Sequence, residues 1–256
     1  MTYVNEDLEL AGQRAIVTGA SRGIGAAIAE RLGRNGARVA LVSRKLESLD
    51  RFAAKLAALG VETMTIAANL GRADDVRRIT PQVIEAWGGV DILVNNAATN
   101  PVFGPLTELP EEGWDKILDT NLKGPFLLSQ AVAKDMATRG RGAIVNIAST
   151  GGLEPSPMLG AYCVSKAAII MLTKTLAAEL GPSGIRVNCI APGLVETKFA
   201  EVLVNTPSIH ETIVQRAALR RHGQPEEIAG AAHFLASRAA SYMTGQVMVI
   251  DGGSRY

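Results

Sequence analysis

The chain has 256 residues, 26 basic against 25 acidic, and 47% of them are hydrophobic. A net charge near zero without a basic cluster argues against nucleic acid or an anionic membrane surface as the main partner, and the short, interrupted apolar runs predict no segment of the ~20 residues that span a bilayer. The acidic start lacks a signal-peptide pattern and two cysteines make no disulfide framework, so we expect a cytoplasmic protein with one domain over residues 1–256.

Short apolar segments rich in β-branched residues alternate with helical patterns along the chain. This alternation predicts an α/β fold, a single-domain Rossmann fold with a doubly wound seven-stranded parallel sheet and helices on both faces. The long segment 193–224 contains Pro207 and has no clear pattern, so we expect it to be a substrate loop. The predicted strands are 14–18, 38–43, 62–67, 91–95, 142–148, 186–191 and 246–250.

The first predicted strand runs into the glycine-rich turn TGASRGIG, which is followed by a helical pattern. Gly19 and Gly23 remove side chains where the backbone must turn and approach a ligand, and Gly25 permits close helix packing. The start of the following helix offers free N–H groups to a pyrophosphate. The G-x-x-x-G-x-G spacing differs from the commonest dinucleotide fingerprint, so the turn alone is equally consistent with a structural role.

The second predicted strand ends in Ser43-Arg44-Lys45, where an NAD site usually has a carboxylate that binds the ribose 2′-hydroxyl. Without that carboxylate nothing repels a 2′-phosphate, and Arg44 can donate charge-assisted hydrogen bonds to one. The sequence therefore favours NADP(H), with NAD(H) as the alternative. In that alternative Arg44 is simply a charge at the start of a helix.

Residues 158–180 are rich in Ala, Leu and Ile and predict a helix packed on the sheet. Tyr162 and Lys166 lie four residues apart, on one face of that helix. A nearby ammonium favours the phenolate, so we expect the lysine to lower the tyrosine pKa from ~10 towards a range useful for acid and base catalysis. A surface pair without function is the alternative, which Tyr-x-x-x-Lys alone does not exclude.

Taken together, six motifs resemble, in order and spacing over almost the whole chain, the classical short-chain dehydrogenase/reductase family. They are TGASRGIG, NNAA at 95–98, Asn121 in TNLKG, Ser149, Tyr162-x-x-x-Lys166 and Pro192-Gly193.

The resemblance implies four catalytic residues. Tyr162 protonates the carbonyl oxygen as hydride arrives, Ser149 hydrogen-bonds that oxygen, and Lys166 tunes the tyrosine and binds the nicotinamide ribose. Asn121 holds a water that relays protons to the lysine, although a helical asparagine more often hydrogen-bonds a backbone carbonyl.

The resemblance also implies a cofactor site and two departures within it. The family often has aspartate beside the adenine where this chain has Asn69, and usually glycine at the position of Ala98. Arg22 faces the 2′-phosphate region in relatives that use NADP, and Val195 and Thr197 match positions that meet the nicotinamide carboxamide. The implied cofactor residues are Gly19, Ser21, Arg22, Gly23, Ile24, Gly25, Ser43, Arg44, Asn69, Leu70, Asn95, Ala97, Tyr162, Lys166, Pro192, Gly193, Val195 and Thr197.

The expected pocket walls, at 99–103, 151–159 and 194–222, are mostly apolar, which favours a ketone over a sugar or a charged acid as substrate. Within the family the chain most resembles carbonyl and dicarbonyl reductases, so we expect an NADPH-dependent carbonyl reductase. A 3-oxoacyl-carrier-protein reductase, docking its partner through Arg139 and Arg141, is the alternative, and a non-catalytic dinucleotide-binding sensor is a third. The three histidines lack metal-ligand spacing, so no metal is expected, and the resemblance implies a homotetramer.

Overall fold

A seven-stranded parallel sheet forms the centre of the computed structural model, which describes residues 9–198 and 207–255. The strand order β3-β2-β1-β4-β5-β6-β7 confirms the predicted doubly wound Rossmann fold, and every predicted strand agrees with the observed one to within one residue at either end. The strands are β1 (Arg14–Thr18), β2 (Arg38–Ser43), β3 (Thr63–Ala67), β4 (Ile92–Asn95), β5 (Gly142–Ile147), β6 (Ile185–Pro192) and β7 (Val247–Ile250).

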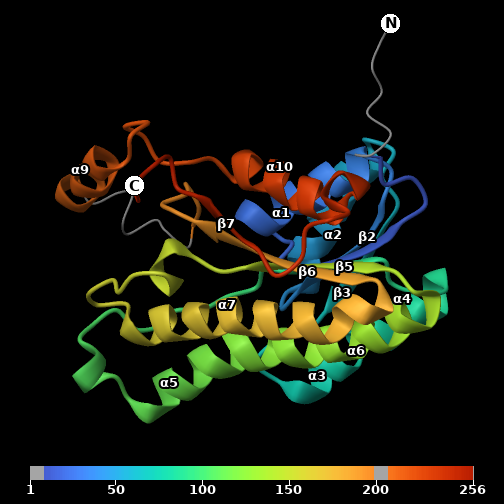
Figure 1. The fold of residues 1–256 in the computed structure, drawn as a ribbon, viewed down its shortest axis with the longest axis horizontal. Coiled ribbons are helices and arrows are strands. Elements are labelled where there is room, and N and C mark those ends of the chain that lie inside the picture. Colours follow the sequence, from blue (N-terminus) through green and yellow to red (C-terminus); the bar gives the residue numbers. More distant parts are fainter. Residues whose placement is uncertain (1–8, 199–206, 256) are drawn as a thin grey trace, which may run out of the picture.

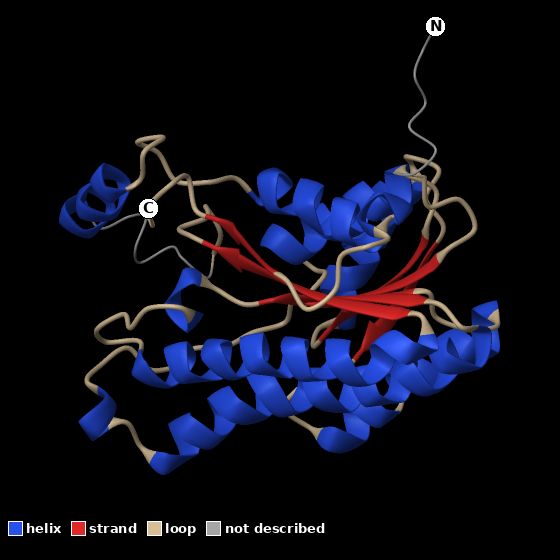
Figure 2. Ribbon diagram, viewed as in Figure 1, coloured by secondary structure: helices blue, strands red, loops and turns tan. Residues whose placement is uncertain are grey.

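Helices cover both faces of this sheet (Figures 1 and 2). One face carries α1 (Gly23–Arg34), α2 (Leu46–Ala57) and α10 (Pro225–Ala236). The other carries α3 (Ala73–Arg77), α4 (Ile79–Trp87), α6 (Gly124–Arg139) and α7 (Gly160–Leu180). Two further helices, α5 (Glu111–Leu118) and α9 (Pro207–Arg216), lie towards one end of the molecule, and a π-helical turn at Asp119–Lys123 joins α5 to α6.

The strands are apolar on both sides because each side faces a separate core. Along β1, Ala15 and Val17 pack beneath α1 and α10, whereas Ile16 packs against the opposite helical layer. Side chains alternate between the two faces of a strand, so a continuous apolar run is what a doubly covered sheet requires. This is why apolar strand segments that alternate with helical patterns allowed the parallel sheet to be predicted.

The neighbouring strands β1 and β4 mark the point where the chain changes direction across the sheet. Val17 pairs with Val94 in this register, and the chain continues from β1 to one edge and from β4 to the other. The connections after these two strands diverge, which leaves a crevice at their carboxyl ends. Ligands of open α/β sheets bind in such a crevice.

Helix α7 begins at Gly160, two residues later than predicted. Met158 has a φ of +69°, which no helical residue adopts, and its carbonyl oxygen accepts a hydrogen bond from the backbone N–H of Gly104 at 3.0 Å. A contact with a loop more than fifty positions earlier therefore sets the start of the helix, and such a contact leaves no trace in the local apolar pattern.

Across the described ranges, the stretch Gly160–Ser183 is long and apolar enough to cross a bilayer by length and composition alone. The prediction that no segment reaches this length was therefore wrong by that measure. Half of its most apolar window is buried inside the protein, as in the core helix of a globular domain, and its buried side chains include the polar residues Lys166 and Thr173.

A buried ion cluster lies at the amino-terminal edge of the sheet, around Asp91 before β4. Its carboxylate accepts hydrogen bonds from Arg14 Nε at 2.7 Å and Nη2 at 3.0 Å, and it also contacts Arg139. Arg139 in turn reaches Asp135 at 2.7 Å. Burial raises the pKa of Asp91, but the arginine hydrogen bonds outweigh it and hold the pKa below its ordinary value, so the group is a carboxylate at neutral pH.

We predict that Asp91→Ala lowers the free energy of unfolding by about 3–5 kcal/mol, because it leaves two arginines without their shared buried carboxylate. Urea denaturation measures the loss. Asp74→Ala is the matched control: Asp74 pairs with Arg77 at 2.9 Å, but their side chains are 94% and 65% exposed, so it should cost less than about 0.5 kcal/mol. Equal losses in the two variants would show that burial of the cluster contributes nothing.

Candidate active site

A cleft of about 800 Å³ lies at the carboxyl ends of the central strands, where the topology places the crevice. It is formed by the turns that follow β1 to β5, with contributions from α5 and α7 and from the segment after β6. Most of the predicted cofactor residues line it: Gly19, Ser21, Arg22, Gly23, Ile24, Gly25, Ser43, Arg44, Asn69, Leu70, Ala97, Tyr162, Lys166 and Thr197.

The glycine turn after β1 is tightly packed against the turn after β4. Gly19 has a φ of +66°, and a Cβ there would lie 2.7 Å from Asn96 Nδ2. A Cβ on Gly25 would lie 2.4 Å from the Gly19 carbonyl oxygen. Asn96 Nδ2 donates to the Thr18 carbonyl at 2.8 Å, and Thr18 Oγ1 accepts the Asn96 N–H at 2.9 Å. Only glycine therefore allows the two turns to meet at the floor of the cleft.

The start of α1 faces this floor and fits an anionic group. Its N-cap residue, Arg22, has extended backbone and makes no side-chain capping hydrogen bond, so the first N–H groups of the helix remain available to a ligand. Such N–H groups, together with the helix dipole, suit a phosphate. This supports the predicted pyrophosphate site.

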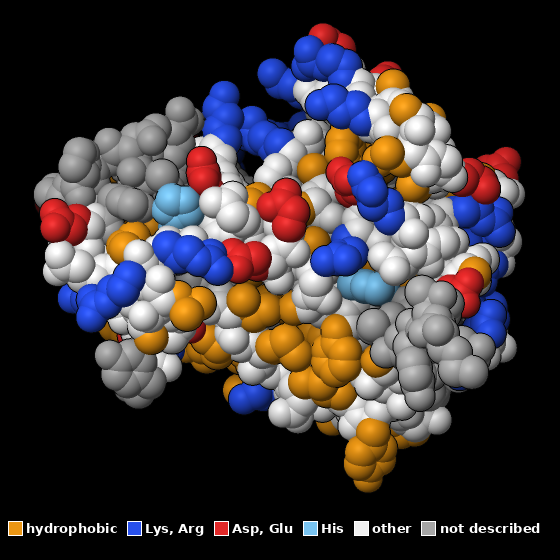
Figure 3. Space-filling view, turned by 90° about the horizontal axis from the view of Figure 1, so that it is seen from above, with side chains coloured by type: hydrophobic (Ala, Val, Ile, Leu, Met, Phe, Trp, Pro, Cys, Tyr) orange, Lys and Arg blue, Asp and Glu red, His pale blue; other side chains and the backbone are white. Residues whose placement is uncertain are grey.

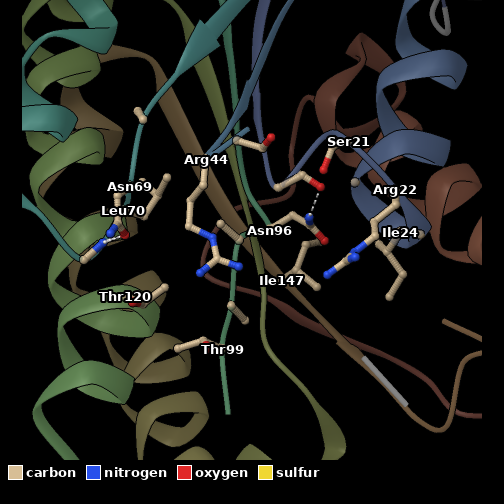
Figure 4. A pocket seen from close by; sticks show the side chains of 18 of the residues that line it. Ser21, Arg22, Ile24, Arg44, Asn69, Leu70, Asn96, Thr99, Thr120 and Ile147 are labelled. Carbon is tan, nitrogen blue, oxygen red and sulfur yellow. Dashed lines mark hydrogen bonds between the residues drawn. The ribbon is translucent and has the colours of Figure 1, made fainter. Parts of the chain in front are cut away.

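The turn after β2 contributes basic rather than acidic side chains. Arg44 reaches into the cleft between Asn69 and Arg22 (Figure 4). Lys45 and Lys198 also line the cleft, although the sequence predicted no role for either. The described acidic lining residues come from the α5 side, at Glu112, Asp115 and Asp119. The end of β2 thus presents cations where a nucleotide would place its ribose.

Tyr162, Ser149 and Lys166 meet beside the end of β5. Ser149 follows β5 by two residues and hydrogen-bonds the Tyr162 hydroxyl. Lys166 is 3% exposed; its Nζ donates to the Ile147 carbonyl at 2.8 Å and lies 5.5 Å from the centre of the tyrosine ring. The predicted catalytic trio is therefore brought together, with Tyr162 and Lys166 lining the cleft.

The predicted direction of the tyrosine pKa is wrong for the protein without its cofactor. Burial raises the pKa of Tyr162 to about 12, although the Ser149 hydrogen bond acts in the opposite direction. Burial also lowers the pKa of Lys166 to about 8. Desolvation disfavours both charged forms, and the lysine donates a hydrogen bond to a backbone carbonyl. The site therefore holds a protonated phenol beside a lysine that loses its proton easily.

Asn121 lies outside the cleft lining, in the π-helical turn between α5 and α6. Its side chain is 1% exposed; Oδ1 accepts the Thr99 N–H at 2.8 Å, and Nδ2 donates to the Thr99 carbonyl at 3.0 Å and to Ser165 Oγ at 3.1 Å. The side chain thus makes the backbone contacts given above as the alternative. It fixes Thr99, which lines the cleft, and ties it to α7 next to Lys166.

Four predicted cofactor residues do not line the cleft. Asn95 is buried below it, where Nδ2 donates to Ser129 Oγ and Asn146 Oδ1, and its neighbour Asn96 faces the cleft instead because side chains alternate along a strand. The other three residues outside the cleft lining are Pro192, Gly193 and Val195. Gly193 is packed closely, since a Cβ there would lie 2.8 Å from Asp251 Cα, and Val195 belongs to the hydrophobic core.

Several cleft residues were not predicted. The sequence offers a signal for some, because Lys45 lies in the same short run as Arg44, and Asn96 lies in the NNAA motif. Thr120 and Lys198 adjoin the predicted residues Asn121 and Thr197, but nothing in the sequence indicates that their own side chains face a ligand, and only the fold shows that they line the cleft. Within residues 9–198 and 207–255, no group of three or more His, Cys, Asp or Glu side chains could hold a metal ion.

Known proteins match the chain over nearly its whole length. A family model described as "Enoyl-(Acyl carrier protein) reductase" matches residues 19–255. Dehydrogenase/reductase SDR family member 4 of Bos taurus is 47% identical over 240 residues, covering 94% of this chain and 86% of that protein.

Two solved structures show the same fold. Gluconate 5-dehydrogenase from Burkholderia cenocepacia, in complex with NADP and tartrate, is 34% identical with a TM-score of 0.93, and the match covers 97% of each chain. A 7 alpha-hydroxysteroid dehydrogenase in complex with NADH and 7-oxo glycochenodeoxycholic acid is also 34% identical with a TM-score of 0.93, covering 97% of this chain and 96% of that one.

We predict that the Tyr162 phenol of the cofactor-free protein stays protonated until the pH approaches about 12. The test is the ultraviolet absorbance of tyrosinate against pH, taken as the difference between wild type and Tyr162→Phe. Ser149→Ala should move this difference curve to still higher pH, because the serine hydrogen bond lowers the tyrosine pKa. A midpoint at or below ~10, the ordinary value for tyrosine, would contradict the prediction.

Proposed function

The chain belongs to the short-chain dehydrogenase/reductase family, which interconverts C=O and CH–OH groups with NAD(P), and from this we propose that it is an NADPH-dependent ketone reductase with Tyr162 as general acid and base. One observation carries the proposal: Ser149 contacts Tyr162 at the end of β5, and Tyr162 and Lys166 line the same cleft as the glycine turn after β1. The reverse oxidation of a secondary alcohol uses the same groups.

The residues of the site suit proton transfer to a carbonyl oxygen. Bound NADPH supplies the hydride. The Tyr162 phenol is protonated at neutral pH and donates its proton to the oxygen, while Ser149 donates a second hydrogen bond where negative charge develops. Lys166, with a pKa of about 8, can be charged or neutral near neutrality, so it can restore the proton of Tyr162 after each turnover.

The charges around the turn after β2 support NADPH over NADH. Arg22, Arg44, Lys45 and Lys198 all line the cleft, and Arg44 can bind a 2′-phosphate through two parallel hydrogen bonds. The two solved relatives described above contain NADP in one case and NADH in the other. Family membership therefore leaves the choice open, and the residues of this chain carry the argument.

Exposed apolar side chains in the predicted pocket walls support an apolar ketone. Four apolar side chains in the three segments predicted to form the pocket walls are between 38% and 63% exposed: Phe103, Leu153, Met158 and Leu219. Side chains of this size are normally buried, so their exposure in these segments supports a bulky apolar ligand. The 7-oxo steroid held by one solved relative is a ketone on a large apolar ring system, although this ligand is also a carboxylic acid.

The carrier-protein alternative loses the docking surface expected for it. Arg139 is bound to Asp91 and Asp135 at the amino-terminal edge of the sheet, and Arg141 lies 3.8 Å from Asp91. The cleft opens at the carboxyl edge. These two arginines therefore cannot hold a carrier protein at the entrance, so we favour a free ketone as substrate.

We further propose that the protein assembles with copies of itself through α6 and α7, as the family resemblance implies. Phe126, Val164 and Met171 on these helices are between 40% and 61% exposed. A second copy would remove this apolar surface from water. A homotetramer is the assembly that we expect.

We predict that Tyr162→Phe lowers kcat/KM for ketone reduction by about 10²- to 10⁴-fold, because it removes the proton donor. The assay follows NADPH absorbance with a panel of ketones, 1,2-diketones and acetoacetyl thioesters. Ser149→Ala should cost about 10²- to 10³-fold on the same substrates. Wild-type turnover no faster than that of Tyr162→Phe over the whole panel would favour the dinucleotide sensor instead.

We predict that Arg44→Ala raises the Kd of NADPH by roughly 10-fold or more and changes that of NADH by less than about 3-fold, because only NADPH carries the charge that the guanidinium binds. Fluorescence titration with each nucleotide measures this. Arg34→Ala is the matched control, since Arg34 pairs with Glu30 on the exposed side of α1 and should alter neither Kd. An equal loss for both nucleotides in Arg44→Ala would refute the assignment.

A further inference from the structure

The turn after β5 places one carboxylate close to the proposed site of proton transfer. Glu154 is the only charged residue in the predicted pocket wall 151–159, and its N–H donates to the Thr150 carbonyl at 3.1 Å. The turn lies against the tyrosine ring, because a Cβ on Gly151 would lie 3.9 Å from Tyr162 Cε1. A substrate held at Tyr162 is therefore exposed to the charge at this turn.

Arg255 pairs with this carboxylate. Its Nη2 lies 3.0 Å from Glu154 Oε1, and its Nη1 donates a long hydrogen bond, 3.5 Å, to the Thr150 carbonyl. The Arg255 side chain is 25% exposed and the Glu154 side chain is 62% exposed. The guanidinium is thus mostly covered by the protein, whereas most of the carboxylate faces water.

Hydrogen bonds fix the path of the segment that carries Arg255 from the end of β7 to this turn. Asp251 follows β7 directly; its Oδ1 accepts the Gly253 N–H at 2.9 Å, and its Oδ2 accepts from Ser254 Oγ at 2.8 Å. The Gly253 carbonyl accepts the Ala218 N–H at 3.1 Å. The contact between Arg255 and Glu154 therefore belongs to an ordered part of the fold.

The pair changes the balance of charge around the site. Glu154 and Arg255 together carry no net charge, and Lys166, 5.5 Å from the centre of the Tyr162 ring, adds a positive charge whenever it is protonated. Without Arg255 the carboxylate of Glu154 would be unpaired and would repel an anionic substrate. Charges act more strongly on one another near a protein surface than in bulk water.

We propose that Arg255 determines the charge selectivity of the substrate site: by neutralising Glu154, it allows ketones with an apolar body and a carboxylate to be reduced as well as neutral ketones. This inference rests on the proposed function, since it concerns the substrate of the same site. Arg255 acts through Glu154, so its own contact with the substrate is not required.

The test compares two substrates that differ in charge. One is an aryl ketone with a distal carboxylate and the other is its methyl ester, both at pH 7, where the carboxyl group is ionised. NADPH absorbance gives kcat/KM for each. We expect Arg255→Ala to lower the ratio of the carboxylate value to the ester value by about 3-fold or more at low ionic strength, and Glu154→Gln to raise it, because each variant changes the local charge by one unit. Both shifts should shrink in ~1 M salt.

Two further variants serve as controls. Arg255→Ala combined with Glu154→Gln removes both charges and should return the ratio close to its wild-type value. Arg34→Ala also removes one positive charge, but Arg34 pairs with Glu30 on the exposed side of α1, so the ratio should not change. Each ratio is measured within one variant, so a partial loss of stability or of total activity does not alter it.

A ratio that stays low in the double variant would show that Arg255 acts by holding the turn in place, which overturns the proposal. An unchanged ratio in both single variants overturns it as well, and Glu154→Gln alone decides the matter if Arg255→Ala does not fold. A wild type that reduces the ester but not the carboxylate also overturns it and leaves the proposed function intact. Failure of the wild type to reduce any ketone of the panel overturns the proposed function and this proposal with it.

Discussion

The hydrogen bond from the Lys166 ammonium to the Ile147 carbonyl, 2.8 Å long and almost wholly buried, determines the geometry of the site. It joins helix α7 to the last residue of β5. The contact therefore sets the position of the helix along the direction of the strands. Ser149 follows two residues after Ile147, and Tyr162 lies one helical turn before Lys166, so one contact brings the two hydroxyls within hydrogen-bonding distance. The same burial moves both pKa values towards the neutral forms, which holds the proton on the phenol.

The nucleotide half of the cleft depends on close backbone contact, not on buried charge. Thr18 at the end of β1 binds the backbone of Asn96 at the end of β4, and the glycine turn fits against the Asn96 amide. Directly below, Asn95 is bound to Asn146 on β5 and to Ser129 on α6. Two adjacent asparagines thus have different roles: Asn95 connects β4 to its neighbours in the interior, and Asn96 forms part of the floor of the cleft. Their alternation on a single strand explains the division.

The sequence allowed the strands and the cofactor turn to be predicted because their signals are local. β-branched runs mark strands, and glycine marks a turn that no other residue can form. Features that depend on contacts between residues far apart in the sequence were not predicted or were predicted wrongly. The start of α7 depends on Gly104, the cleft position of Lys198 depends on the path after β6, and the tyrosine pKa depends on burial that a four-residue spacing does not reveal. For Asn121, the contacts with Thr99 agree with the more ordinary of two roles considered for a helical asparagine.

The amino ends and the carboxyl ends of the strands carry groups with different roles. The arginines and aspartates around Asp91 lie at the amino ends of the strands, and the cleft lies at the carboxyl ends. The face of the molecule seen from above in Figure 3 exposes both charged and apolar side chains. A strand's length of apolar core separates the ion cluster from the cleft. Changes in the loops at the carboxyl ends can therefore alter ligand binding while the ion cluster keeps its contacts, so affinity and stability can be varied separately in this fold.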